Sequence, residues 1–160
     1  MDKTRQLALF DYSTLDHDTR SFVQTKTAEI KNLIEYGLPI TVGIGRRLSE
    51  VKNRFESRYL SKPDEFIRGK EVEIDKLLRD AAVFSIEIGR ITHAVYKMLK
   101  YNNYIAWVMA ENGLQQTERF GKKALQVNEL YEYAVDIENI PRNKLFSISE
   151  GLILPEDNGD

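Results

Sequence analysis

Residues 29–55 read EIKNLIEYGLPITVGIGRRLSEVKNRF, and residues 73–99 repeat the pattern as EIDKLLRDAAVFSIEIGRITHAVYKML. Aligned without gaps, the two copies match apolar positions with apolar positions, and they also match Gly45 with Gly89. This agreement is typical of two copies of one amphipathic helical unit. We therefore expect an all-α fold, an elongated helical bundle of long amphipathic helices.

The composition indicates an ordinary globular protein. A length of 160 residues is enough for a sizeable core, and 42% of the residues are hydrophobic and 30% charged. The absence of cysteine excludes disulfides, thiolate metal sites and cysteine nucleophiles. No apolar run approaches the roughly 18 residues of a membrane span, and the polar start MDKTRQ lacks a signal-peptide core. We expect a soluble, cytoplasmic protein with no membrane partner.

Charge is distributed unevenly along the chain. Residues 129–160 hold eight acidic and two basic side chains, whereas the whole chain has a net charge of −2. Residues 1–128 therefore carry a net charge of +4. A mildly basic body is compatible with nucleic-acid contact, although solvated helix faces produce the same balance.

Breaks in the helical pattern divide the chain into four segments. A first helix is expected from a capping box at Ser13 and Asp16 to about Tyr36, because Ser13 can accept from backbone N–H groups of the first turn. The sequence Gly-Leu-Pro at 37–39 is expected to interrupt it, since proline lacks the N–H of the helical ladder. The predicted segments are an N-terminal helical unit (1–60), a long second-copy helix (61–100), a helix-turn-helix-like segment (101–140) and an acidic tail (141–160).

The break between the two copies is predicted at Ser61–Asp64, where Pro63 can open the next helix. That helix is expected to reach about Lys100. Residues 142–154 are expected to form a short helix or an extended clasp.

The segment AWVMAENGLQQTERFGKKALQV at 106–127 has the spacing of a helix-turn-helix. Gly113 is expected to take a positive φ in a tight turn, followed by a helix from about Gln115 to Tyr133. Amide, guanidinium and ammonium groups suit base edges and phosphates. The candidate DNA contacts on this helix are Gln116, Arg119, Lys122 and Lys123. The alternative is a pair of antiparallel helices whose polar side chains simply face water.

A second basic cluster lies on the first copy. Arg46, Arg47 and Arg54 are candidate contacts to a phosphate backbone. The alternative is a solvated face in which the arginines pair with Glu50 and Glu56. The repeat-matched glycines, Gly45 and Gly89, are expected to let another helix approach closely.

No set of residues indicates catalysis or a metal site. The two histidines are far apart in sequence, without ligand-spaced partners. Nothing assembles a nucleophile, a base and oxyanion donors, so we expect a non-enzyme without metal or cofactor. The aromatic residues Tyr104, Trp107 and Tyr131 are expected to pack the junction between helices, or alternatively to form an interface with another protein.

Three stretches of the chain carry a family resemblance: DYSTLDHDTRSFVQTKTAEIKNLI at 11–34, IGRRLSEVKNRF at 44–55 and NNYIAWVMAENG at 102–113. They resemble the bacterial family called domain of unknown function 3102, which occurs in phages, plasmids and integrated elements. The resemblance spans most of residues 10–131. About 45 residues carrying the second copy intervene, which suggests duplication of the family's helical unit, and the segment after Gly113 is one residue short. The family has no settled activity, so the resemblance implies an origin in a mobile element.

Two functional hypotheses follow. The first is a non-enzymatic DNA-binding accessory or regulatory protein of a phage, plasmid or other mobile element. The alternative is a protein-binding modulator, such as an inhibitor of a host defence or replication protein, that uses the acidic tail and the aromatic junction. Long helices with narrow apolar seams often complete their burial by pairing, so a homodimer is expected in either case.

Overall fold

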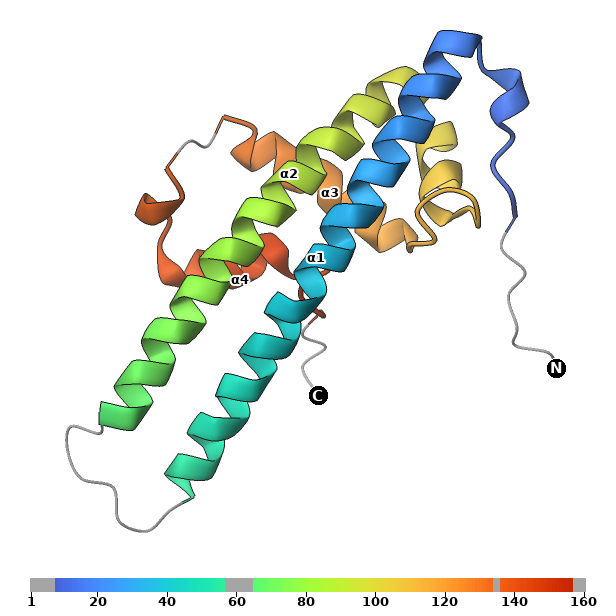
Figure 1. Cartoon of the computed structure of the whole chain (residues 1–160). Helices are drawn as coiled ribbons and strands as arrows, with labels where there is room; N and C mark the ends of the chain where they lie inside the picture. The colour runs from blue at the N-terminus through green and yellow to red at the C-terminus, as the bar shows by residue number, and fades with distance from the viewer. Residues whose placement is uncertain (1–7, 57–64, 134–135, 157–160) are drawn as a thin grey trace, which may run out of the picture. The chain divides into compact units, whose positions relative to one another are not determined.

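The computed structural model describes residues 8–56, 65–133 and 136–156, and it is all-α. Apart from an isolated bridge between Glu150 and Leu154, the described residues form no β-structure. The predicted all-α helical bundle is therefore confirmed. Figure 1 shows the two long helices, α1 and α2, packed side by side as an antiparallel pair. The elements are η1 (Tyr12–Thr14), α1 (His17–Phe55), α2 (Glu65–Met109), α3 (Glu118–Tyr131), η2 (Ile137–Asn139) and α4 (Arg142–Ser149).

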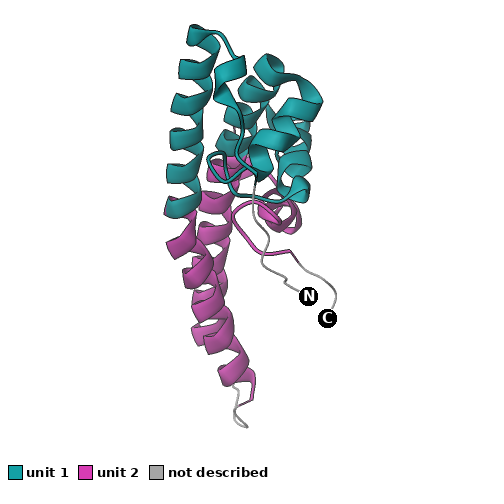
Figure 2. Cartoon of the chain, turned by 90° about the vertical axis from the view of Figure 1, so that its right-hand side faces the viewer, with its two compact units in different colours: residues 1–35, 86–133 teal, residues 36–85, 134–160 magenta. Residues whose placement is uncertain are grey.

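The chain forms two compact units, each discontinuous in sequence (Figure 2). Unit 1 comprises residues 1–35 and 86–133, and unit 2 comprises residues 36–85 and 134–160. Because α1 and α2 are antiparallel, the first part of one helix lies beside the last part of the other. The compact units consequently do not follow the four sequential segments expected from the sequence. The predicted break at Ser61–Asp64, with Pro63, lies outside the described residues.

The start of α1 differs from the predicted capping box. Asp16, not Ser13, is the cap, since its Oδ1 accepts a 2.7 Å hydrogen bond from the N–H of Thr19. This bond lowers the pKa of Asp16. Ser13 lies in η1 instead, where its N–H donates to Asp11 at 3.0 Å. A carboxylate is the stronger acceptor at a helix N-terminus, which accounts for the choice.

The predicted interruption at Gly37-Leu38-Pro39 is wrong, because α1 continues through Pro39 to Phe55. Tertiary contacts in unit 2 hold this part of the helix. The hydroxyl of Thr41 donates to the carbonyl of Ile153 at 2.8 Å, and the side chain of Ile153 packs directly on Gly37. Packing of this kind offsets the one backbone hydrogen bond that a proline removes.

The predicted end of the long helix at about Lys100 coincides with a kink in α2. Lys100 has φ 68° and ψ 168°, outside the helical region, and the chain is helical again up to Met109. The short helix expected before Asn112 is therefore present as the last part of α2.

Unit 1 has an apolar core in which two buried hydrogen bonds join different helices. The Trp107 indole N–H donates to the Thr27 hydroxyl at 3.0 Å, and the Tyr104 hydroxyl donates to the Gly121 carbonyl at 2.7 Å. These bonds satisfy polar groups that would otherwise be buried without partners. The other large buried side chains of this core include Val23, Ile30, Ile88, Val95, Leu99, Val108, Leu114, Phe120 and Val127.

Unit 2 encloses its own core, which α4 and the following turn complete. The predicted short helix is confirmed, but the description of residues 141–160 as a tail is wrong as far as Leu154. Apolar side chains of this stretch are buried because they cover α1 and α2 within the unit, and Ser149 pairs with Ser85 at 2.9 Å. The buried apolar residues of the stretch are Leu145, Ile148, Leu152 and Leu154.

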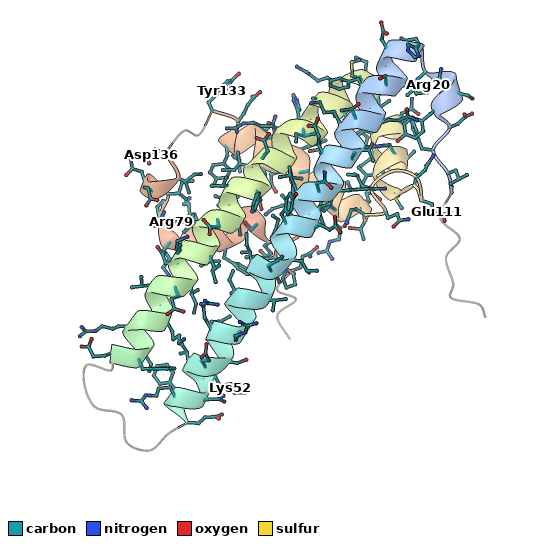
Figure 3. All side chains as sticks on the ribbon, viewed as in Figure 1. Arg20, Lys52, Arg79, Glu111, Tyr133 and Asp136 are labelled. Carbon is teal, nitrogen blue, oxygen red and sulfur yellow. The ribbon has the colours of Figure 1, made fainter. Side chains whose placement is uncertain are left out.

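The connection to α4 is held by Arg79, which Figure 3 labels on α2 together with Asp136 on the neighbouring segment. The guanidinium of Arg79 donates to the carbonyl of Ile137 at 2.8 Å and pairs with Asp75 at 3.1 Å. This arginine thus ties η2 to α2 within unit 2.

The two repeat-matched glycines have different surroundings. A Cβ atom at Gly89 would lie 3.0 Å from the Ala124 carbonyl oxygen, so close packing against α3 is confirmed there. A Cβ atom at Gly45 would meet nothing within 4 Å, so the same prediction is wrong for Gly45. The reason is that α3 covers the second copy at this position and no described segment covers the first.

Candidate nucleic-acid interface

One side of α3 is anchored in the core of unit 1, which determines the side that faces outward. Thr117 caps the helix, because its hydroxyl accepts a 3.1 Å hydrogen bond from the N–H of Phe120. Phe120, Ala124 and Val127 are at most 3% exposed. Their spacing of four and three residues leaves the opposite side of the helix to solvent.

The outward side of α3 carries Arg119, Lys122, Lys123 and Gln126, which we call the basic face. These residues follow one another at positions i, i+3, i+4 and i+7, so they lie in one row on the helix. Arg119, Lys122 and Gln126 are exposed, and Lys123 is half-buried. The sequence predicted the three cations correctly as neighbours on one helix face.

A carboxylate neighbour stabilises the charged form of Lys122. Its ammonium group lies 3.1 Å from a carboxylate oxygen of Glu118, one turn earlier, and this partner raises the pKa of Lys122. Tyr101, which follows the kink in α2, makes a smaller contribution in the same direction. The phenol of Tyr101 is 42% exposed and so adds an aromatic surface near the cations.

Gln126 and Tyr101 were missed as site residues. Gln126 had a signal, because it lies seven residues after Arg119 on the predicted helix. No signal in the sequence points to Tyr101, because only the kink at Lys100 and the packing of α3 on α2 bring it near Lys122.

The turn before α3 differs from the predicted one. The helix begins at Glu118 rather than Gln115, so Gln116 precedes it and its N–H donates to the Val108 carbonyl at 2.9 Å. The positive φ expected at Gly113 occurs at Gln115, with φ 56°. Gly113 is needed for another reason, because a Cβ there would lie 1.8 Å from the Trp107 carbonyl oxygen.

The connection between α2 and α3 thus runs from Ala110 to Thr117. It is longer than the three- or four-residue turn of a helix-turn-helix. The half-buried Gln116 precedes α3 and is therefore not part of the row that forms the basic face.

The second basic cluster belongs to unit 2, where two of its three arginines are engaged. Arg47 pairs with Glu73 at 2.7 Å and donates to the Gly43 carbonyl at 3.1 Å. Arg54 lies over the ring of Phe66, 5.6 Å from its centroid, whereas Arg46 is exposed. The pairing with Glu50 expected for these arginines is therefore not the one that Arg47 makes. Glu50 pairs with Lys70 instead, at 3.3 Å.

The aromatic residues considered as a protein interface are mostly interior. Tyr104 and Trp107 are 0% exposed and hydrogen-bonded in the core of unit 1, so they offer no contact surface in the folded unit. Tyr131 is half-buried. The first expectation, that these rings pack the junction between helices, is confirmed for Tyr104 and Trp107, whose ring centroids lie 5.9 Å apart.

Two further properties of the described residues bear on function. No three histidine or carboxylate side chains lie together as metal ligands in that part of the chain. Among the helices described, none combines the length and the apolar character needed to cross a membrane.

The fold and the site define an all-α helical bundle with an outward-facing basic helix. No protein-family model, curated protein or solved structure matches this chain. The resemblance to domain of unknown function 3102 therefore stays a prediction from the sequence.

Proposed function

We propose that the protein is a non-enzymatic DNA-binding accessory or regulatory protein that contacts DNA through the basic face of α3. The observation that carries the proposal is the single row formed by Arg119, Lys122, Lys123 and Gln126. The opposite side of the same helix is anchored by buried apolar residues, so the row is held in place before DNA binds.

The dimensions and chemistry of the row suit a duplex. Seven residues of helix span about 10 Å, comparable to the ~12 Å width of the major groove. Arginine and lysine can neutralise phosphates or pair with guanine, while the glutamine amide can pair with adenine. The exposed ring of Tyr101 offers a surface against sugar or base.

Binding by this face is expected to be local and strongly dependent on salt. Unit 1 contains eleven acidic and eleven basic residues, so its net charge gives no general attraction to DNA. With about three phosphates neutralised, the logarithm of the binding constant should fall by about 2.7 for each tenfold rise in salt concentration.

A role in a phage, plasmid or other mobile element is part of the same proposal. It rests on the resemblance described from residues 11–34, 44–55 and 102–113. The DNA-binding part of the proposal does not depend on it.

The test is a fluorescence-anisotropy titration of random duplex DNA at several salt concentrations, with wild type and the double variant Arg119→Glu/Lys122→Glu. We expect wild-type binding to weaken steeply with salt, and the variant to lose at least tenfold in affinity and about two units of salt slope. The matched control is Arg68→Glu/Lys76→Glu on α2, which makes the same change of charge. Lys76 pairs with Asp80 one turn away, as Lys122 does with Glu118.

Absence of binding at low salt, or an equal loss in both double variants, would contradict the proposal. The second hypothesis, a protein-binding modulator, would then be the one to pursue. It would need a surface other than Tyr104 and Trp107, because both are buried.

A further inference from the structure

A row of exposed apolar side chains on α1 is not covered by any segment of unit 2 that the structure describes. Leu38, Val42, Leu48 and Phe55 are 63%, 53%, 53% and 60% exposed. Gly45 lies between them, with nothing within 4 Å of a Cβ built there. We call these five residues the α1 face. An exposed apolar patch of a few hundred Å² is often a functional surface.

The internal repeat indicates that a face of this kind is normally covered. Forty-four positions later, Ala82, Ile86, Thr92 and Leu99 occupy the matching places and are at most 2% exposed. Gly89 matches Gly45, and there the backbone of α3 approaches to 3.0 Å. The same positions of the helical unit are thus packed in the second copy and bare in the first.

The spacing of the α1 face is self-complementary. Leu38, Gly45, Leu48 and Phe55 are separated by seven, three and seven residues, which places the first two at a positions and the last two at d positions of a heptad pattern. The series of spacings is the same whether it is followed from the N-terminal or from the C-terminal end of the helix. When two copies of such a helix cross antiparallel, Leu38 of one meets Phe55 of the other, and Leu48 of one lies over Gly45 of the other.

We propose that the α1 face binds the α1 face of a second copy of this chain, with the two helices antiparallel. Such an interface is isologous and closes at two copies. The four apolar side chains offer roughly 400 Å² per protomer, about half of what each partner contributes to a stable interface. The flanking aliphatic stem of Lys52, which Figure 3 labels on α1, and the small side chain of Ser49 extend this surface. The inference is independent of the proposed DNA binding.

The first test is the molar mass in solution, measured by sedimentation velocity from low micromolar to hundreds of micromolar protein. Wild type is expected at twice 18.6 kDa in the upper part of this range. Gly45→Glu should raise the dissociation constant by roughly a hundredfold, since it places a charge in the contact. Gly69→Glu is the matched control, because Gly69 is also an exposed helical glycine with nothing within 4 Å. Leu48→Glu is the second variant of the face.

The second test determines the direction of the helices by cysteine cross-linking. The chain has no cysteine, so single-cysteine variants report on one position each. In the antiparallel pair, Leu48→Cys lies beside the twofold axis and should form a disulfide-linked dimer. Phe55→Cys would be about 25 Å from its counterpart along the helix and should not.

Three results would overturn the proposal. One is a wild-type monomer throughout the concentration range, which would leave the face to a different protein partner. Another is a dimer that Gly45→Glu and Leu48→Glu do not weaken more than Gly69→Glu. The third is cross-linking of Phe55→Cys as readily as Leu48→Cys, which indicates parallel helices.

Discussion

Lys100 is one of two residues other than glycine with positive φ among those the structure describes. Its φ of 68° and ψ of 168° belong to a region that is populated almost only by glycine. Leu99 before it and Tyr104 after it are both buried in unit 1. Backbone strain at this residue thus accompanies a turn of the chain between two buried side chains.

Lys100→Gly is expected to stabilise the protein by about 1–2 kcal/mol, because glycine adopts this backbone conformation without a Cβ clash. The measurement is the free energy of unfolding in urea. Lys97→Gly is the control, since it also removes an exposed lysine but lies in regular helix, where glycine should cost about 1 kcal/mol. A loss of stability in both variants would show that Lys100 is not strained.

The buried hydroxyl of Tyr104 links the stability of the protein to alkaline pH. Burial raises the pKa of Tyr104 well above its ordinary value of 10.0. The unfolded chain therefore ionises near pH 10 while the folded one keeps the phenol neutral. The stabilisation is fully present below pH 10, and above it about 1.4 kcal/mol is lost for each pH unit until the folded pKa is reached.

Urea unfolding of wild type and Tyr104→Phe between pH 9 and 11 would measure this effect. The variant loses the hydrogen bond to the Gly121 carbonyl and should be less stable at pH 9. Its stability should then fall less steeply with pH than that of wild type. Parallel curves for the two proteins would contradict the assignment to Tyr104.

At the scale of the element, α1 is continuous at a point where the local sequence predicts a break. Pro39 lies inside the helix and cannot donate the N–H of the ladder. The contacts of Gly37 and Thr41 with Ile153 hold the backbone on either side of Leu38. Helical geometry here is therefore maintained against local propensity.

Pro39→Ala should consequently stabilise the protein, by up to about 3 kcal/mol, because it restores the hydrogen bond and removes the clash of the ring. The exposed Pro39 makes no contribution to the core that alanine would lose. Urea denaturation, with helix content followed by circular dichroism, provides the measurement. An unchanged or lower free energy of unfolding would mean that the proline conformation is required.

At the scale of the whole molecule, two copies of one sequence pattern end in different surroundings. Leu48 is 53% exposed and its counterpart Thr92 is 0% exposed, although the helical phase is the same. The more polar of the two matched residues is the buried one. Position relative to the remaining elements, rather than hydrophobicity alone, decides which copy is covered.

Part of the candidate site follows from periodicity alone. The common face of Arg119, Lys122 and Lys123 needs only a helix of ordinary pitch, and the sequence places those residues three and four apart. The start of α3 was missed by three residues, because Thr117 rather than the preceding glutamines provides the cap. The sequence predicts Arg47 as a contact to a phosphate backbone, but in the structure its guanidinium pairs with Glu73 of α2.

The sequence by itself determined that the chain is helical, which faces of its helices are apolar, and that one helical unit occurs twice. These properties depend on residues three and four apart, and such short-range patterns are visible in the chain. Only the tertiary structure decided that α1 runs through Pro39, that α4 is part of a core, and that Gly89 is covered while Gly45 is bare. The reason is that these features depend on contacts such as Thr41 with Ile153, between residues far apart in sequence.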